Sequence, residues 1–279
     1  MGSTLILIQC RDNMGLVSRI AATIVMHNLN IDAMQEFVDS NESLFFARFE
    51  CSGAAPDSEL LRSELLNHLP PDAMVTVNPS SPKKLAVLVT KEYHCLGDIL
   101  VRNFFQTKDS KVVCVIGNHK DLKPFTKKFS VPFYHVSNKD KSREDFEREI
   151  LEVLAAYQPD YLVLAKFMQI LSTDFVAQYP NRILNIHHSF LPAFAGARPY
   201  GQAFIRGVKL IGATAHFVTG SLDDGPIITQ RTIPIDHNYT IDEIVKAGQE
   251  VEKTVLNKAI ELLSRNQVFT TGNKTIVFE

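Results

Sequence analysis

The sequence lacks tryptophan, has few cysteines and contains no long apolar run. No stretch approaches the roughly 18 apolar residues that a membrane-spanning helix needs, and no basic-plus-apolar leader precedes a cleavage site. We therefore expect no membrane association and a cytoplasmic location. Cys10, Cys51, Cys95 and Cys114 are scattered, with neither a CxxC pair nor a zinc-type spacing. This pattern predicts reduced thiols and no metal site.

An excess of positive charge is also lacking. The chain carries 29 Lys and Arg against 31 Asp and Glu, for a net charge of −2, and it has no basic block. This balance argues against a nucleic-acid partner, because phosphate-backbone binding requires clustered positive charge. With 279 residues, the chain predicts one large domain or two modest ones.

The first eighty residues predict a small α/β unit. Apolar residues recur at helical spacing from Leu16 onward, and Asp12 stands where a helix N-cap would lie. A second helix is expected after Pro56. Strand-like stretches occupy residues 5–8, 30–38, 45–49 and 74–77. The order βαββαβ predicts a ferredoxin-like sheet with two helices on one face.

A polar segment with two prolines, residues 78–84, is the best linker in the chain. It divides a domain of residues 1–82 from a domain of residues 83–279. In the second domain strands alternate with helices, which predicts a doubly wound, mostly parallel sheet. The expected strands are residues 85–89, 112–116, 132–136, 161–164, 183–186, 213–218 and 226–235, and the main helices are residues 96–105, 142–157 and 241–263. In such sheets ligands bind at the carboxyl ends of the strands.

Two polar segments of the second domain are candidates for chemistry. Asn185 and His187 follow a buried strand and can point to the same side of the chain. An amide can stabilise a developing oxyanion, and an imidazole can transfer a proton. The loop at residues 219–226 carries Asp223 and Asp224, and a carboxylate from it could orient His187. The alternatives are a capped turn with ordinary surface histidines and a solvated acidic turn, and spacing alone does not decide between them.

These residues resemble a known signature. Asn185-Ile186-His187, followed by Ser-x-Leu-Pro and later by Asp223-x-Gly-x-Ile-Ile, is similar to the catalytic pattern of the folate-dependent formyltransferases. Residues 90–98, 187–194 and 196–200 narrow the resemblance to the formyltetrahydrofolate deformylases. The first domain resembles an ACT domain, so the resemblance covers essentially the whole chain.

The resemblance implies roles for individual residues. Asn185 would bond the formyl oxygen, and His187 would assist it and help to protonate the departing N10 of the folate. Asp223 rather than Asp224 matches the essential acid of the family, because Gly225 and the isoleucine pair after it fix the register. It would orient His187 and organise the attacking water. His216 matches a histidine near the site in related enzymes, although a buried structural histidine is an equally good interpretation.

The resemblance also implies a folate site and no cofactor or metal. The residues expected to contact the folate are Phe167, Met168, Ile170, Leu171, Val218 and Leu222. The alternative for residues 167–171 is simply the start of a buried helix.

The segment after the first strand of the second domain distinguishes hydrolysis from transfer. An enzyme that formylates a nucleotide needs a Gly- or Ser-rich phosphate cradle there, whereas this chain has Glu92, Tyr93 and a single glycine, Gly97. Water is then the expected acceptor. The implied reaction converts 10-formyltetrahydrofolate into tetrahydrofolate and formate, which supplies formate for purine synthesis and balances one-carbon folate pools. The rival hypotheses are a formyltransferase acting on a small amine and an amino-acid sensor that binds folate without turnover.

The ACT-like domain implies regulation. Amino-acid effectors, with methionine and glycine as opposed candidates, would bind at the loop before the first helix. That loop consists of Asp12, Asn13, Met14, Gly15 and Leu16. Such domains pair, so a homo-oligomer is expected. The alternative is that this domain only dimerises.

Overall fold

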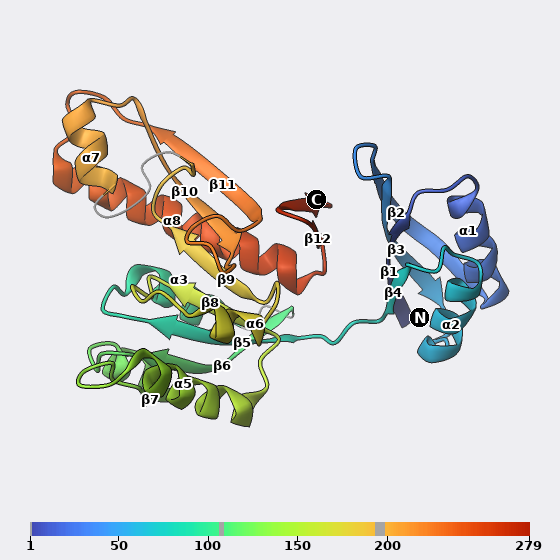
Figure 1. Cartoon of the computed structure of the whole chain (residues 1–279), viewed down its shortest axis with the longest axis horizontal. Helices are drawn as coiled ribbons and strands as arrows, with labels where there is room; N and C mark the ends of the chain where they lie inside the picture. Colours follow the sequence, from blue (N-terminus) through green and yellow to red (C-terminus); the bar gives the residue numbers. More distant parts are fainter. Residues whose placement is uncertain (1, 106–108, 193–198) are drawn as a thin grey trace. The chain divides into compact units, whose positions relative to one another are not determined.

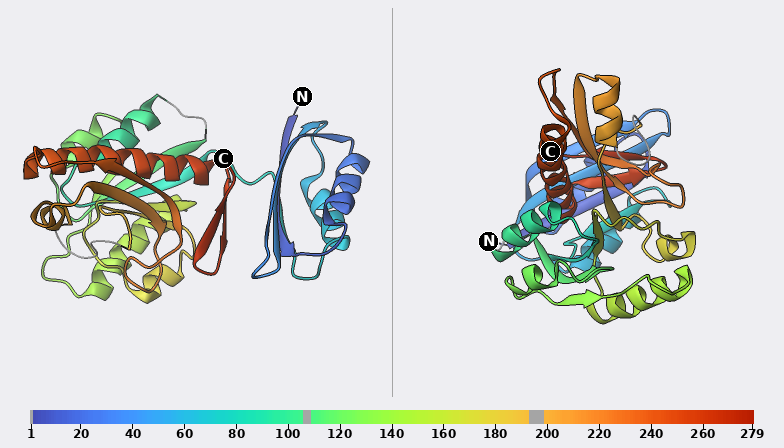
Figure 2. Two further views of the ribbon diagram at one scale, coloured as in Figure 1. Left: turned by 90° about the horizontal axis from the view of Figure 1, so that it is seen from above. Right: turned by 90° about the vertical axis from the view of Figure 1, so that its left-hand side faces the viewer.

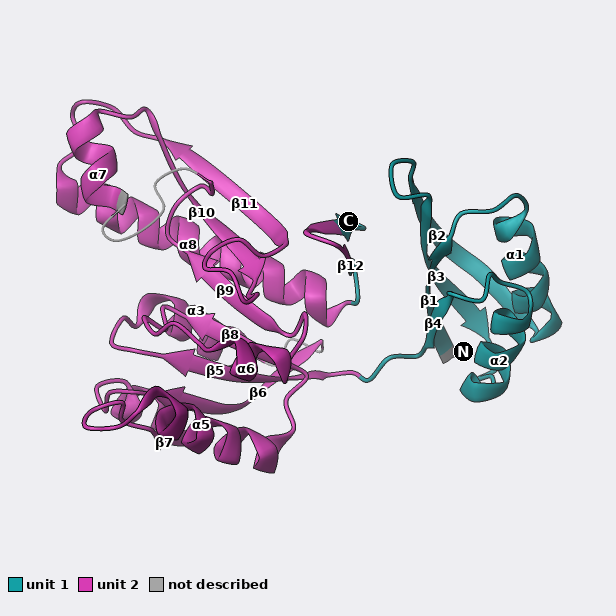
Figure 3. Cartoon of the chain, in the orientation of Figure 1, with its two compact units in different colours: residues 1–80, 266–269, 276–279 teal, residues 81–265, 270–275 magenta. Residues whose placement is uncertain are grey.

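The computed structural model describes residues 2–105, 109–192 and 199–279 and divides into two compact units (Figure 3). Unit 1 comprises the chain up to Ser80 together with Asn266–Phe269 and Ile276–Glu279. Unit 2 comprises Ser81–Arg265 and Thr270–Thr275. The sequence analysis assigned all of residues 83–279 to one domain. The structure differs because segments at the carboxyl end pack on unit 1.

Unit 1 is the ferredoxin-like βαββαβ fold that the sequence predicts. Its elements are β1 (Gly2–Arg11), α1 (Leu16–Met26), β2 (Leu29–Asp39), β3 (Leu44–Gly53), α2 (Ser58–Asn67) and β4 (Met74–Val77). The four strands form an antiparallel sheet in the order β2-β3-β1-β4. Both helices lie on one face of that sheet (Figure 2). Between them is a core that includes Ile6, Ile20, Phe49 and Leu65.

The other face of this sheet is also partly covered. Phe46 points away from the helices but is fully buried. Its ring lies 6.5 Å from that of Phe37 and 5.7 Å from that of Phe269. Gln35 donates a 2.9 Å hydrogen bond from Nε2 to the carbonyl oxygen of Glu279. These contacts explain why the last residues of the chain belong to unit 1.

Unit 2 contains the larger sheet (Figure 1). Its strands are β5 (Lys83–Val89), β6 (Ser110–Gly117), β7 (Phe133–His135), β8 (Tyr161–Ala165), β9 (Ile183–His187), β10 (Leu210–Phe217) and β11 (Ile227–Pro234), and its helices are α3 (His94–Phe104), α4 (Lys123–Lys127), α5 (Arg143–Tyr157), α6 (Thr173–Ala177), α7 (Pro199–Arg206) and α8 (Ile241–Ser264). The strand order is β11-β10-β9-β8-β5-β6-β7. Strands β5 to β9 are parallel, whereas β10 and β11 pair antiparallel. The predicted doubly wound, mostly parallel sheet is confirmed.

Helices cover both faces of the larger sheet. Helices α5 and α6 share a core with one face of β5 and β8. Helices α3 and α8 pack against each other on the opposite face (Figure 2). Every residue from Leu85 to Val89 is therefore buried. Helix α8 begins at a capping box, in which the side chains and backbone amides of Thr240 and Glu243 are reciprocally bonded.

Some local features differ from the sequence analysis or decide between its alternatives. The N-cap of α1 is Gly15, with a φ of 79°, and not Asp12, whose backbone amide instead donates to the carbonyl oxygen of Ser43. A hairpin of β12 (Val268–Thr271) and β13 (Lys274–Val277) follows α8. Residues 167–171, for which the sequence analysis left the start of a helix as an alternative, form a loop. Among the helices in the described part of the chain, none combines the length and hydropathy needed to span a bilayer.

Candidate active site

A cavity of about 720 Å³ opens at the carboxyl ends of β8 and β9. Its wall includes all three predicted catalytic residues, Asn185, His187 and Asp223. Asn185 and His187 lie on β9, and Asp223 lies in the loop between β10 and β11. Thus the topology brings to one place side chains that are 36 positions apart, from Asp223 to His187.

His187 and Asp223 are in direct contact. The Nδ1 atom of His187 lies 3.3 Å from Oδ1 of Asp223. This contact with His187 holds the pKa of Asp223 below its usual range. The Nε2 atom of His187 is buried and has no hydrogen-bond partner among the described residues. An imidazole bonded at Nδ1 presents Nε2 for proton transfer, so the catalytic edge of His187 is set by Asp223.

The backbone of the acidic loop is specialised. Asp223 has a φ of +54°, a left-handed conformation that Asp and Asn tolerate better than most residues. A side chain at Gly225 would collide with the carbonyl oxygen of Phe217. Glycine at that position lets the loop pass close to β10, which keeps the carboxylate of Asp223 in contact with His187. The neighbouring Asp224 is exposed and does not line the cavity.

Asn185 is oriented by His216. The Nδ1 of His216 bonds the carbonyl oxygen of Phe217 at 2.8 Å, so it carries the hydrogen. The Nε2 of His216 is then free to accept from Nδ2 of Asn185, at 3.2 Å. His216 is only 2% exposed, and burial lowers its pKa, which keeps it neutral. The two interpretations of His216 therefore combine, because it is buried and also touches the site.

The predicted folate residues form one wall of the cavity. All six line it: Phe167, Met168, Ile170, Leu171, Val218 and Leu222. Phe167 is buried and its ring stacks 6.3 Å from that of Phe146, so it anchors the loop. Met168, Ile170 and Leu222 are each more than half exposed. Exposed apolar side chains around a cavity are the usual lining for a flat aromatic ligand.

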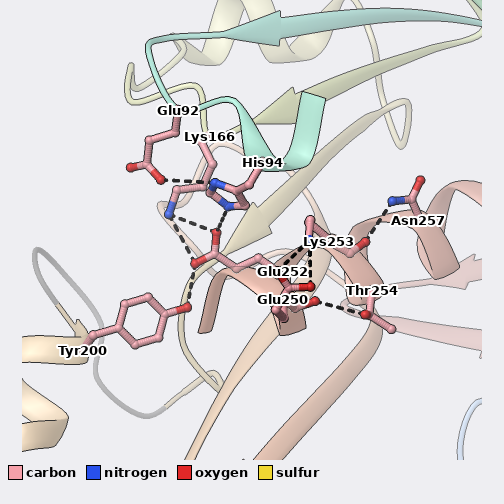
Figure 4. Close-up of polar contacts among 9 residues, drawn as sticks. All are labelled: Glu92, His94, Lys166, Tyr200, Glu250, Glu252, Lys253, Thr254 and Asn257. Carbon is pink, nitrogen blue, oxygen red and sulfur yellow. Dashed lines mark hydrogen bonds and ion pairs between the residues drawn. The ribbon is translucent and has the colours of Figure 1, made fainter. Parts of the chain in front are cut away.

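A buried polar cluster, which the sequence analysis missed, forms another part of the wall (Figure 4). At its centre is Glu252 of α8, which is fully buried. Its carboxylate lies 3.2 Å from Nζ of Lys166 and 2.8 Å from Nε2 of His94, and it accepts a 2.6 Å hydrogen bond from the Tyr200 hydroxyl. Burial alone raises the pKa of Glu252, but the His94 bond, the Lys166 charge and the Tyr200 bond together lower it to about 2. We call Lys166, Glu252, His94 and Tyr200 the Glu252 cluster.

His188 lies near both the Glu252 cluster and the reacting centre. The ring of His188 lies 6.1 Å from that of Tyr200 and 5.3 Å from that of His187. Burial, followed by the charge of Lys166, lowers the pKa of His188 to about 4. His188 is therefore neutral at physiological pH.

One group of residues has the spacing of metal ligands. Ligand atoms of His94, Cys95 and Glu252 lie within 4.8 Å of one another. However, Lys166 already places an ammonium group 3.2 Å from Glu252. Burial also raises the pKa of the Cys95 thiol well above its usual value, which opposes formation of the thiolate that binds metals. These residues fit an ion-pair cluster better than a metal site.

The predicted effector loop lies in unit 1. Met14 is 92% exposed, and its carbonyl oxygen accepts a hydrogen bond from Nη1 of Arg19. Leu16 is buried in the core, so its side chain is not available to a ligand. Asp12, Asn13 and Gly15 are exposed. The predicted family signature also includes residues 187–194 and 196–200. Of these segments, residues 193, 194 and 196–198 lie outside the residues that the structure describes.

Comparison with known proteins agrees with this geometry. The family model described as formyl transferase matches residues 83–260. The formyltetrahydrofolate deformylase of Escherichia coli strain K12 is 46% identical over 268 residues, which cover 96% of this chain and 95% of the relative. The one from Haemophilus influenzae is 45% identical over 273 residues, or 98% of each chain.

Solved structures give the same result. The crystal structure of a formyltetrahydrofolate deformylase from Pseudomonas syringae matches with a TM-score of 0.93 and 35% identity, and covers 99% of this chain and 94% of the other. A glycinamide ribonucleotide transformylase from Symbiobacterium toebii matches with a TM-score of 0.67 and 30% identity, over 71% of this chain and 94% of the other. The chain therefore belongs to the formyl transferase family and, within it, to the formyltetrahydrofolate deformylases.

Proposed function

We propose that this chain hydrolyses 10-formyltetrahydrofolate to tetrahydrofolate and formate. The observation that carries the proposal is the cavity in which Asn185, His187 and Asp223 meet, in a chain similar to deformylases along nearly its whole length. The glycinamide ribonucleotide transformylase from Symbiobacterium toebii, in contrast, matches over 71% of this chain.

Asn185 stabilises the oxygen of the formyl group in this proposal. Its amide has two hydrogens. One is directed to Nε2 of His216, which fixes the orientation of the amide, and the other is left for the substrate. A fixed donor that meets the developing oxyanion lowers the barrier because no reorganisation is needed during the reaction.

His187 and Asp223 transfer the protons. The oxygen of water adds to the formyl carbon and loses a proton to this pair. The bond between carbon and N10 then breaks, N10 receives a proton, and formate is released. Asp223 keeps the hydrogen of His187 on Nδ1, so Nε2 faces the reacting atoms. No oxidant, metal or cofactor takes part in this balance.

The folate lies against the apolar wall defined above. Backbone groups of residues 168–171 and 218–222 are suited to bond the donors and acceptors of a pterin, while Met168, Ile170 and Leu222 cover its faces. Glu92 also lines the cavity, and its negative charge would oppose the binding of a phosphate-bearing acceptor.

Acceptor-free turnover tests the proposal. Purified protein is incubated with 10-formyltetrahydrofolate in the absence of any amine, and formate and tetrahydrofolate are measured. Steady release of both, in equal amounts, is expected. Release only after addition of an amine would identify a transferase instead, and binding without turnover would identify a sensor.

We further propose that this activity supplies formate for purine synthesis in the cytoplasm. The four buried cysteines are all unpaired, which suits a reducing compartment. Growth that depends on this chain when other formate sources are removed is the expected result. Growth without it under those conditions would contradict the pathway role.

We also propose that unit 1 pairs with a second copy and binds amino-acid effectors, methionine and glycine, at Asp12–Gly15. The exposure of Asp12, Asn13 and Met14 supports this, and Leu16 contributes its backbone alone. Titration of each amino acid against formate release should give opposite responses. Gly15→Ala strains a φ of 79° and should weaken them. Identical or absent responses in the unaltered chain would contradict the effector proposal.

A further inference from the structure

Lys166 adopts a backbone conformation that is unusual for a lysine. It directly follows β8 at the cavity wall and has a φ of +59°, in the left-handed region that favours glycine. Its side chain is nevertheless buried, with 5% exposed. A non-glycine residue persists in such a conformation only where its surroundings hold it there, and such residues concentrate at functional sites.

The side chain of Lys166 is held rigidly. Its Nζ lies 3.4 Å and 3.2 Å from the two carboxylate oxygens of Glu252. Glu252 is fixed in turn by His94 and Tyr200 (Figure 4). The proposed hydrolysis uses none of these four side chains to move a proton or to bind the folate. The Glu252 cluster therefore needs another explanation.

The Glu252 cluster borders the reacting centre. Strand β8 pairs with β9, and Leu164 is aligned with Asn185, so Lys166 follows the strand adjacent to the catalytic one. Lys166, Tyr200 and Glu252 line the same cavity as His187. The apolar wall offers a surface for the folate. If the folate lies there, a second substrate would have to approach the formyl carbon along the polar wall.

We propose that Lys166 is a specificity-determining residue that excludes amine acceptors from the formyl carbon. In this proposal the Lys166 side chain, held by Glu252, occupies the space through which an amine would reach the formyl carbon, and the space that remains admits a water molecule. This inference rests on the proposed hydrolysis. In the reaction that is excluded, an amine nitrogen adds to the formyl carbon and loses a proton, the bond to N10 breaks, and N10 gains a proton. Both reactions use the same centre, so the space at the acceptor side selects between them.

Lys166→Gly tests the role of this volume. Glycine suits the positive φ, and Glu252 keeps its bonds to His94 and Tyr200, but loss of the ammonium leaves a buried carboxylate without its charge partner and should lower the melting temperature. The product ratio is therefore measured below the melting temperature of the variant, where circular dichroism shows that it is folded. The probe is glycinamide, a primary amine without a phosphate, added with 10-formyltetrahydrofolate. The ratio of formylglycinamide to formate should rise about 10-fold or more over the unaltered chain, the scale of discrimination that pocket methylenes provide.

Two further variants serve as controls. Gln158→Gly relieves a similar left-handed residue, with a φ of 48°, at the exposed end of α5, away from the cavity, and should leave the ratio unchanged. Lys166→Met keeps most of the side-chain volume but removes the charge, and should also keep the product almost entirely formate. A purely structural role for Lys166 would alter stability or total turnover without changing the product ratio.

The inference fails if Lys166→Gly gives the same ratio as the unaltered chain while it still releases formate, or if Lys166→Met raises the ratio as much as the glycine variant. The unaltered chain gives a test that needs no variant. At saturating glycinamide it should still form mostly formate, with only a small proportion of formylglycinamide, and formylation of the amine at a rate comparable with hydrolysis would overturn the inference. Failure of the proposed function is a different result, because the unaltered chain would then release no formate from water alone.

Discussion

Replacement of Glu252 by glutamine should strongly destabilise unit 2. The carboxylate is fully buried and lies 3.2 Å from the ammonium of Lys166, whose side chain is 5% exposed. Glu252→Gln leaves that ammonium buried without a compensating charge, which typically costs about 3–5 kcal/mol. In addition, the new amide group donates hydrogens, as do His94 and Tyr200, so one bond of the cluster is lost. At about 2–4 °C per kcal/mol for a unit of this size, the melting temperature should fall by roughly 6–20 °C.

Thermal and urea unfolding, followed by circular dichroism, measure this effect. Glu250→Gln is the matched control, because Glu250 lies on the same helix but its side chain is 72% exposed and pairs with Lys253. An exposed pair contributes at most about 1 kcal/mol. The double variant Lys166→Met with Glu252→Gln should recover roughly 1–3 kcal/mol relative to Glu252→Gln alone. A Glu252→Gln protein as stable as the Glu250→Gln control would refute the view that the Glu252 cluster is a coupled, buried ion pair.

Other predictions concern the reacting centre and the response to pH and metals. Asp223→Asn preserves the shape of the side chain and tolerates the positive φ, but it favours the wrong tautomer of His187. Turnover in formate assays should therefore fall roughly 10²–10⁴-fold while folate binding persists. Asp224→Asn should retain near-normal turnover, and the reverse pattern would place the essential acid one residue later. The pKa of His188 is lowered to about 4 from 6.5, so the unfolded chain binds more protons between these values and stability should decline as pH falls from 6.5 to 4, by up to about 3 kcal/mol. Urea titrations of His188→Gln should show a smaller decline, and an unchanged one would contradict this assignment. Chelation of divalent metals should leave formate release unaltered, since Lys166 already neutralises the carboxylate of the ligand-like cluster; loss of activity that added metal restores would contradict this.

The sequence was most informative where a pattern has one physical explanation. The apolar run at residues 85–89 has no polar side to face water, which fits only a strand covered on both sides, and the structure buries it in this way. Asn185 and His187 were found because polar residues at the end of such a strand lie where parallel sheets form sites. The contact between His187 and Asp223 required the resemblance as well, since nothing local in the acidic loop reveals its partner.

Features that depend on distant partners could not be predicted in this way. Lys166 and Glu252 are 86 positions apart, and each alone is an ordinary charged residue at the end of a strand or on a helix. One feature of the sequence does point to a buried charge, since Glu252 lies among apolar residues of α8, between Val251 and Val255. However, it does not indicate that Lys166 is the residue that pairs with it. The burial of Phe46 likewise depends on Phe269, which arrives from the other end of the chain.

The loop at residues 167–171 illustrates a different difficulty. Its apolar composition suits the start of a buried helix as well as the wall of a cavity. The structure keeps Phe167 buried and leaves Met168 and Ile170 exposed in a loop. Composition could not distinguish the two cases, because exposed apolar residues around a binding site have the same sequence signature as a core.

The origin of the oxygen in formate tests the central claim most directly. Turnover of 10-formyltetrahydrofolate by the unaltered chain, in water labelled with heavy oxygen and without any amine, should place one labelled oxygen in each formate released. The other oxygen comes from the formyl group bound by Asn185. Formate without label, or no formate until an amine is added, would contradict the conclusion that Asn185, His187 and Asp223 direct water to the formyl carbon.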